Sequence, residues 1–137
     1  MLALAEAIRL GSVDCVTALE AVIGTDSEIT FKLAFRVASL LASNEESRVT
    51  LFEEMKAFYD ARSKLVHGGE LKPKQRDTIA RVDDLRAHVR RLLRAFVLLA
   101  IRDDAIYTRT FFRERLDSAL LNEVQRNELR KALGLRE

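Results

Sequence analysis

Apolar residues recur every three or four positions through much of the chain, the spacing of a helix with one buried face. The pattern is clearest between residues 76 and 103, where we expect one long helix. Its apolar face comprises Val82, Leu85, Val89, Leu92, Leu93, Phe96 and Leu99. A basic stripe of Arg86, Arg90 and Arg94 leads onto the polar side, as is more typical of a solvated face than of a phosphate-tracking one.

A second helix, over residues 27–42, is apolar around most of its circumference, with only Lys32, Arg36 and Ser39 forming a polar strip. It is therefore expected to be central and nearly buried. The same patterns predict a helix over 45–66 and another over 2–22, which Gly11-Ser12 could break in two. One or two short helices are expected over 108–133, ending near Gly134.

Capping residues and loop residues agree with these limits. Thr25 with Glu28, and Ser43 with Glu46, have capping-box spacing before two of the helices. The only clear loop is "GGELKPKQ", from Gly68 to Gln75. The sequence predicts an all-α fold, a compact antiparallel bundle of four to five helices with short C-terminal helices, and one domain over residues 1–137. It leaves open whether the chain is a piece of a longer protein.

Composition narrows the function classes. The chain has 137 residues, 48 % hydrophobic and 32 % charged, which is typical of a globular domain with its own core. Two histidines and the lone Cys15 are too few for a convincing metal site, so no metal is expected. The net charge of +2 excludes a polybasic tail and leaves room for a local basic patch.

Location is predicted from what the sequence lacks. No apolar run approaches the roughly 18 residues that span a bilayer, so no membrane association is expected. The first residues lack a basic leader and include Glu6, unlike a signal peptide. A single cysteine fits a reducing compartment, and a cytoplasmic location is the default expectation.

The stretch "FYDARSKLVHGG", residues 58–69, places an arginine on an apolar helix face. That face contains Met55, Phe58, Tyr59, Leu65 and Val66. Arg62 falls at its middle, and an unpaired buried arginine would cost several kcal/mol. Arg62 therefore either pairs with a carboxylate inside the bundle or lines a cleft or subunit seam that an anion can reach.

His67 lies five residues after Arg62, about 140° further round an ideal helix. We expect Gly68-Gly69 to let the last turn unwind and bring His67 to the same groove. Two copies related by a two-fold axis would then combine two arginines and two histidines in one site. The structural alternative is a buried Arg62 ion pair with His67 capping the helix C-terminus; from spacing alone, it is the commoner arrangement.

These residues resemble a known family. The stretch 58–69 resembles the Arg-x4–6-His signature of HEPN domains, most closely the Apea-like branch, with the motif Tyr-x-x-Arg-Ser-Lys-x-x-His-Gly. Residues 18–41 and the segment "VRRLLRAFVLLAI" also resemble that branch, so the similarity covers about residues 15–120. The resemblance implies a four- or five-helix bundle that dimerises with the motif at the interface.

The resemblance also implies function. Many such domains are metal-independent ribonucleases of toxin and defence systems, whereas others are non-catalytic modules for dimerisation or for binding RNA or nucleotide. It implies that His67 is the acid/base and Arg62 the phosphate stabiliser, with no cofactor. Tyr59, Ser63 and Lys64 would add phosphate contacts, and Arg36 would border the groove, unless it forms a buried structural pair. The expected partners are RNA or a nucleotide, a second copy, and a partner protein such as an antitoxin or a larger defence complex.

Two further residues receive structural interpretations. His88 lies at the edge of the apolar face of the helix over 76–103 and is expected to be a boundary residue. Cys15 is expected to be a small apolar residue.

Overall fold

The computed structural model describes residues 2–24, 28–102 and 114–135. These residues form the helices α1 (Leu2–Ile23), α2 (Ile29–Leu41), α3 (Glu45–Val66), α4 (Pro73–Ala80), α5 (Val82–Ile101), α7 (Leu116–Leu121) and α8 (Glu123–Ala132). No strand occurs in the described ranges, which confirms the all-α class. Within the same ranges, no helix has both the length and the apolar character required to cross a bilayer.

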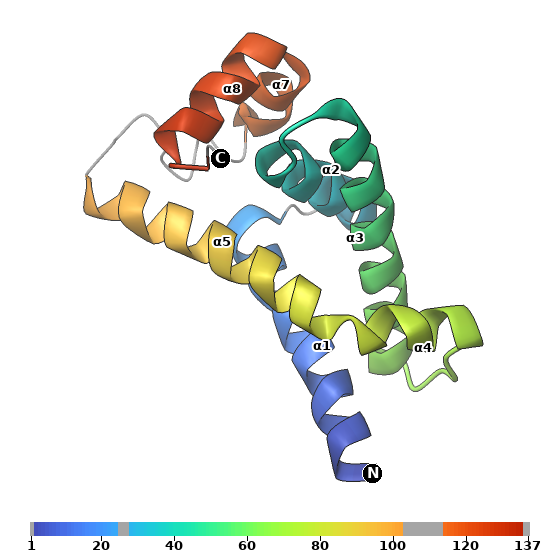
Figure 1. Cartoon of the computed structure of the whole chain (residues 1–137). Coiled ribbons are helices and arrows are strands. Elements are labelled where there is room, and N and C mark those ends of the chain that lie inside the picture. The colour runs from blue at the N-terminus through green and yellow to red at the C-terminus, as the bar shows by residue number, and fades with distance from the viewer. Residues whose placement is uncertain (1, 25–27, 103–113, 136–137) are drawn as a thin grey trace.

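Helix α2 lies at the centre of the fold. It packs along α3 and also contacts α1, α5, α7 and α8 (Figure 1). Leu33, Val37 and Leu40 of α2 are at most 1 % exposed. The predicted central helix is therefore confirmed, because apolar residues on nearly all of its sides meet a neighbouring element.

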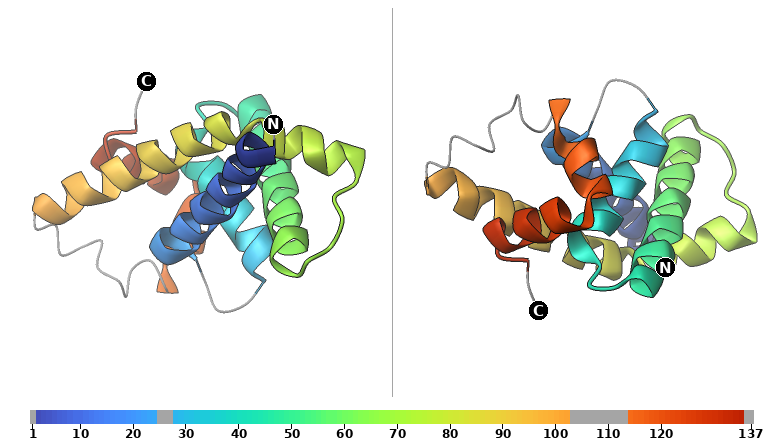
Figure 2. Two further views of the ribbon diagram at one scale, coloured as in Figure 1. Left: turned by 90° about the horizontal axis from the view of Figure 1, so that it is seen from below. Right: turned by 90° about the horizontal axis from the view of Figure 1, so that it is seen from above.

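The remaining helices surround α2 with less regularity than expected. Helices α2 and α3 run antiparallel after a short turn, and α1 packs against both α3 and α5. Helix α5 crosses α1 instead of running along it (Figures 1 and 2). The fully regular antiparallel bundle is therefore not confirmed, although helices do pack around one core.

The long helix expected over residues 76–103 is two helices. Helix α4 begins at Pro73, since proline at the first helical position loses no hydrogen bond and has the required φ. It ends at Arg81 (φ −91°, ψ 26°), and α5 starts at Val82. The loop between α3 and α4 is correspondingly shorter than predicted, because Pro73 and Gln75 are helical.

Helix α1, by contrast, runs through Gly11 without a break. A Cβ atom at residue 11 would clash with the guanidinium of Arg86, which comes from α5. Gly11 therefore lies under the end of the Arg86 side chain and does not end a helix.

The predicted caps are displaced. Helix α3 is capped by Asn44, not Ser43: the Asn44 side chain accepts from the Ser47 backbone N–H (2.8 Å), and Ser47 Oγ accepts from the Asn44 N–H (3.2 Å). Glu28, expected within α2, is instead its N-cap residue and makes no side-chain capping bond. Thr25 and residues 108–113 lie outside the described residues.

Helices α7 and α8 confirm two short C-terminal helices, and two buried arginines of α8 attach it to α2. Arg126, 1 % exposed, donates to the carbonyls of Ser39 (3.1 Å) and Ala42 (3.3 Å). Arg130 donates to the carbonyl of Leu40 at 2.9 Å. These carbonyls belong to the C-terminal turn of α2, where no intrahelical donors remain. The arginines therefore supply hydrogen bonds that the end of α2 would otherwise lack.

Candidate functional site

Helix α3 ends in a glycine cap two residues after Val66. Gly68 is left-handed (φ 71°) and donates its N–H to Leu65 O at 3.2 Å, while Gly69 donates to Lys64 O at 2.8 Å. These two bonds are those of a Schellman motif. The helix stays regular to Val66, so the expectation that the glycines unwind the last turn is wrong: they end the helix.

Arg62 faces helix α1, where it meets Glu20. Its Nη2 lies 3.5 Å from Glu20 Oε2, and the two side chains are 21 % and 24 % exposed. The Arg62 Cζ also lies 5.9 Å from the centre of the Tyr59 ring, within cation–π range. Of the two positions left open by the sequence, the structure of a single chain has the ion pair inside the bundle.

Tyr59 completes a cluster that joins α1 to α3. Burial raises the pKa of its phenol, and the nearby charge of Glu20 raises it further, against the opposing effect of Arg62. We call Glu20, Tyr59 and Arg62 the Glu20 cluster.

The guanidinium of Arg62 is only partly satisfied in this cluster. Its Nε atom is buried and has no hydrogen-bond partner among the described residues. A buried donor without an acceptor costs about 1–3 kcal/mol. Arg62 is consequently held by one long ion pair and a ring contact, not by a complete set of hydrogen bonds.

His67 is exposed at the C-terminal end of α3. Its backbone N–H donates to Ser63 O at 3.1 Å, whereas its ring has no polar partner in the described part of the chain. Ser63 is four residues earlier and shares its side of the helix, but Arg62 lies about 140° away. A single chain therefore does not bring Arg62 and His67 together.

Lys64 and Val66 also lie near the exposed end of α3. Lys64 Nζ donates to the backbone carbonyl of Glu70 at 3.5 Å, a long and exposed hydrogen bond. Val66 is 52 % exposed, which leaves an apolar side chain beside His67.

Arg36 does not lie in an open groove. It is 3 % exposed, and its Nε and Nη2 donate to the two carboxylate oxygens of Asp117 at 2.7 and 3.1 Å. Its Nη1 donates to the carbonyls of Ile23 and Gly24 at the end of α1. This is the buried structural pair that the sequence offered as the alternative, so a phosphate cannot reach Arg36 without breaking the fold locally.

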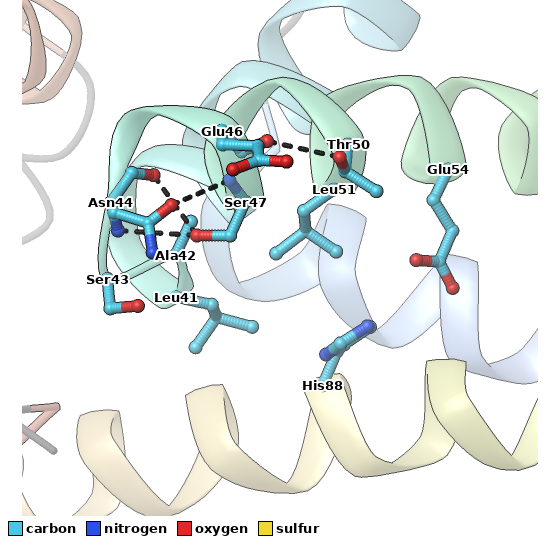
Figure 3. A pocket seen from close by; sticks show the side chains of 10 residues that line it. All are labelled: Leu41, Ala42, Ser43, Asn44, Glu46, Ser47, Thr50, Leu51, Glu54 and His88. Atoms are coloured by element: carbon cyan, nitrogen blue, oxygen red, sulfur yellow. Dashed lines mark hydrogen bonds between the residues drawn. The ribbon is translucent and has the colours of Figure 1, made fainter.

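A separate groove of about 490 Å³ lies between the start of α3 and helix α5 (Figure 3). His88, half-buried, points toward Glu54 across it, and burial lowers the pKa of the imidazole. The polar groups at the other end are already engaged: Asn44 accepts from the Ser47 backbone N–H as the cap of α3, and Thr50 Oγ1 donates to Glu46 O within the helix. Glu54 is two turns, or about 12 Å, from Arg62 along α3, so this groove is not part of the Arg62 region.

The basic stripe of α5 does not form a site with other polar groups among the described residues. Arg86 pairs with Asp83 at 2.8 Å, and Arg90 and Arg94 are exposed with no ion pair to another described residue. Nor do the described residues contain a group of three or more His, Cys, Asp or Glu that could hold a metal ion. No protein-family model, curated protein or solved structure matches this chain.

Glu20 is the residue that sequence reasoning missed. It lies between Leu19 and Ile23, which are both 1 % exposed, so it borders the buried face of α1. No lysine or arginine stands three or four positions from Glu20, so a carboxylate at this border is a signal of pairing with another helix. The partner itself is not readable from the sequence, because Arg62 is 42 residues away.

Proposed function

We propose that the protein is a metal-independent endoribonuclease of the HEPN type, whose site forms where two copies meet. The observation that carries the proposal is the state of the motif on α3. Arg62 is held only loosely, by Glu20 at 3.5 Å, while the His67 ring is exposed and has no polar partner among the described residues. The resemblance of residues 58–69 to the HEPN signature adds the reaction class.

A second copy supplies what one chain lacks. Arg62 and His67 lie on different sides of a regular helix, so one chain cannot place both on the same phosphate. A two-fold dimer across the end of α3 would combine the Arg62 of one copy with the His67 of the other. The exposed Val66 side chain would then be covered at the seam.

The chemistry follows from these two residue types. A neutral His67 takes the proton of the ribose 2′-OH, and the resulting alkoxide attacks the adjacent phosphorus. The bond from phosphorus to the 5′ oxygen breaks, and the same His67, now protonated, gives that oxygen its proton. Arg62 of the second copy donates to the non-bridging oxygens, where negative charge grows. The products are a 2′,3′-cyclic phosphate and a 5′-hydroxyl, and DNA is spared because it lacks the 2′-OH.

Ser63 and Lys64 supply secondary contacts in this proposal. Both follow Arg62 directly and are half-buried, so their polar ends can reach an RNA strand that lies over the end of α3. Tyr59 contributes indirectly, because its ring lies against Arg62.

A second candidate is a non-catalytic HEPN module that dimerises and binds RNA or nucleotide, as part of a toxin or defence system with an antitoxin or a larger complex as partner. The ion pair between Arg62 and Glu20 favours it, because a guanidinium engaged by a carboxylate is less available to a phosphate. In this case the motif would bind without cleaving.

One experiment separates the two candidates. Labelled RNA and DNA of the same sequence are incubated in excess chelator with wild type, Arg62→Ala, His67→Ala and, as a matched control, the exposed Arg94→Ala. Cleavage of RNA alone, by wild type and the control but neither motif variant, supports the nuclease. Binding without cleavage supports the module. A wild-type protein that neither binds nor cleaves the RNA would contradict both candidates.

A further inference from the structure

We infer that Glu20 is a positioning residue that holds Arg62 in the absence of ligand and gives it up to a phosphate group. The inference rests on the proposed function, since it concerns how the same arginine becomes available. Glu20 comes from α1 and Arg62 from α3, so the exchange would occur at the contact between these two helices.

The Arg62 ion pair can be compared with a second arginine–carboxylate pair in the same fold. The structural pair of Arg36 with Asp117 has N–O distances of 2.7 and 3.1 Å, and Arg36 is 3 % exposed. The pair of Arg62 with Glu20 is longer, at 3.5 Å, and both side chains keep more than a fifth of their surface in water. Charge-assisted hydrogen bonds are usually about 2.7–2.9 Å long, so Arg62 is held by attraction more than by a formed bond. The first pair is a structural clamp, and the second is exchangeable.

Glu20 is not left as a buried unpaired charge after the exchange. Its side chain is 24 % exposed and keeps this access to water when Arg62 turns to a phosphate. A new acceptor would also serve an arginine whose Nε has none among the described residues.

The ligand class follows from competition at one guanidinium. Carboxylate and phosphate oxygens both fit the planar fork of arginine, so only one of them can occupy it fully. In addition, the negative charge of Glu20 repels an approaching phosphate. Glu20 should therefore weaken binding of a phosphodiester, and its effect should depend on Arg62.

The test uses the full chain and a non-cleavable probe, a fluorescent 2′-O-methyl RNA decamer. Dissociation constants are compared for wild type, Glu20→Gln, Arg62→Ala and the double variant, with melting temperatures as a check of folding. Glu20→Gln keeps the shape of the side chain and removes its charge. The matched control is Glu53→Gln, which removes an equal charge from exposed α3 surface, where Glu53 pairs with Lys56 at 3.6 Å.

We expect Glu20→Gln to tighten binding about threefold, the size of one partly exposed ion pair, and Glu53→Gln to change it less. The gain should vanish in the Arg62→Ala background. A gain that persists there, equal gains in both glutamate variants, or no gain would overturn the inference.

The same set distinguishes this inference from the nuclease proposal. Tighter binding by Glu20→Gln without any cleavage of ordinary RNA would refute the nuclease and leave the exchange intact. If the decamer binds no variant, inorganic phosphate is used instead, with the rise in melting temperature as the readout. A larger rise for Glu20→Gln than for wild type then supports the exchange, and equal rises overturn it.

Discussion

Arg126→Met tests whether the buried arginines of α8 hold the C-terminal helices to the core. Methionine keeps the apolar stem of the side chain and removes its donors. In the native chain, Arg126 is 1 % exposed and donates to Ser39 O and Ala42 O at 3.1 and 3.3 Å. It also pairs with Glu123.

The magnitude follows from the groups left behind. Each buried carbonyl that loses its donor costs about 1–3 kcal/mol, and two are involved. The Glu123 side chain is 60 % exposed, so losing that pair adds at most about 1 kcal/mol. Removing a buried cation recovers part of its desolvation cost. We expect the free energy of unfolding to fall by about 2–5 kcal/mol.

Urea denaturation followed by circular dichroism measures this loss. At a typical slope of about 2 kcal/mol per molar urea, a loss of about 3 kcal/mol moves the midpoint down by roughly 1.5 M. The control is Arg94→Met on α5, which replaces an exposed arginine without an ion pair to any described residue. It should change stability by less than about 0.5 kcal/mol. A loss below about 1 kcal/mol for Arg126→Met, or an equal loss in the control, would refute the reasoning.

Three further outcomes are expected. Gly68→Ala should lower stability by about 1 kcal/mol, because Gly68 has φ 71°; a urea midpoint equal to wild type would show that the α3 cap is not needed. Hydrogen bonding to Arg126 lowers the pKa of Glu123 to about 2, so the contribution of Glu123 to stability is complete above pH 5 and is lost as the pH falls toward 2. In Glu123→Gln the urea midpoint should therefore depend less on pH over that range, and an unchanged dependence would count against the pair. Arg62→Ala should lower the free energy of unfolding by only about 1 kcal/mol, because Glu20 remains partly exposed to water; a thermal melt showing a loss above about 3 kcal/mol would mean that the pair is a structural one.

Sequence periodicity predicted most helices because their buried faces repeat, as in α2, where eight residues are buried. Periodicity did not predict helix ends that depend on a single residue. The break at Arg81 leaves the apolar spacing on either side unchanged, and the cap of α3 moves by one position between Ser43 and Asn44. Such local choices depend on backbone geometry that a hydrophobic pattern does not contain.

The sequence predicted where Arg62 and His67 lie on their helix, but not what Arg62 contacts. Arg62 on a largely buried helix face and His67 beside a helix end were both readable. The partner of Arg62 was not, because Glu20 and Arg62 meet only when α1 packs on α3. Arg126 shows the same limit: in a polar helix it looks solvated, and its acceptors lie 84 and 87 residues away.

The most direct test of the proposed activity is the end group formed on RNA in excess chelator. Wild-type protein should yield a 2′,3′-cyclic phosphate and a 5′-hydroxyl, resolved by mass spectrometry of a short oligonucleotide. His67→Ala should form neither, and an RNA with a 2′-deoxy sugar at the cleaved position should stay intact. A 3′-hydroxyl with a 5′-phosphate, continued cleavage by His67→Ala, or no cleavage by wild type would contradict the account.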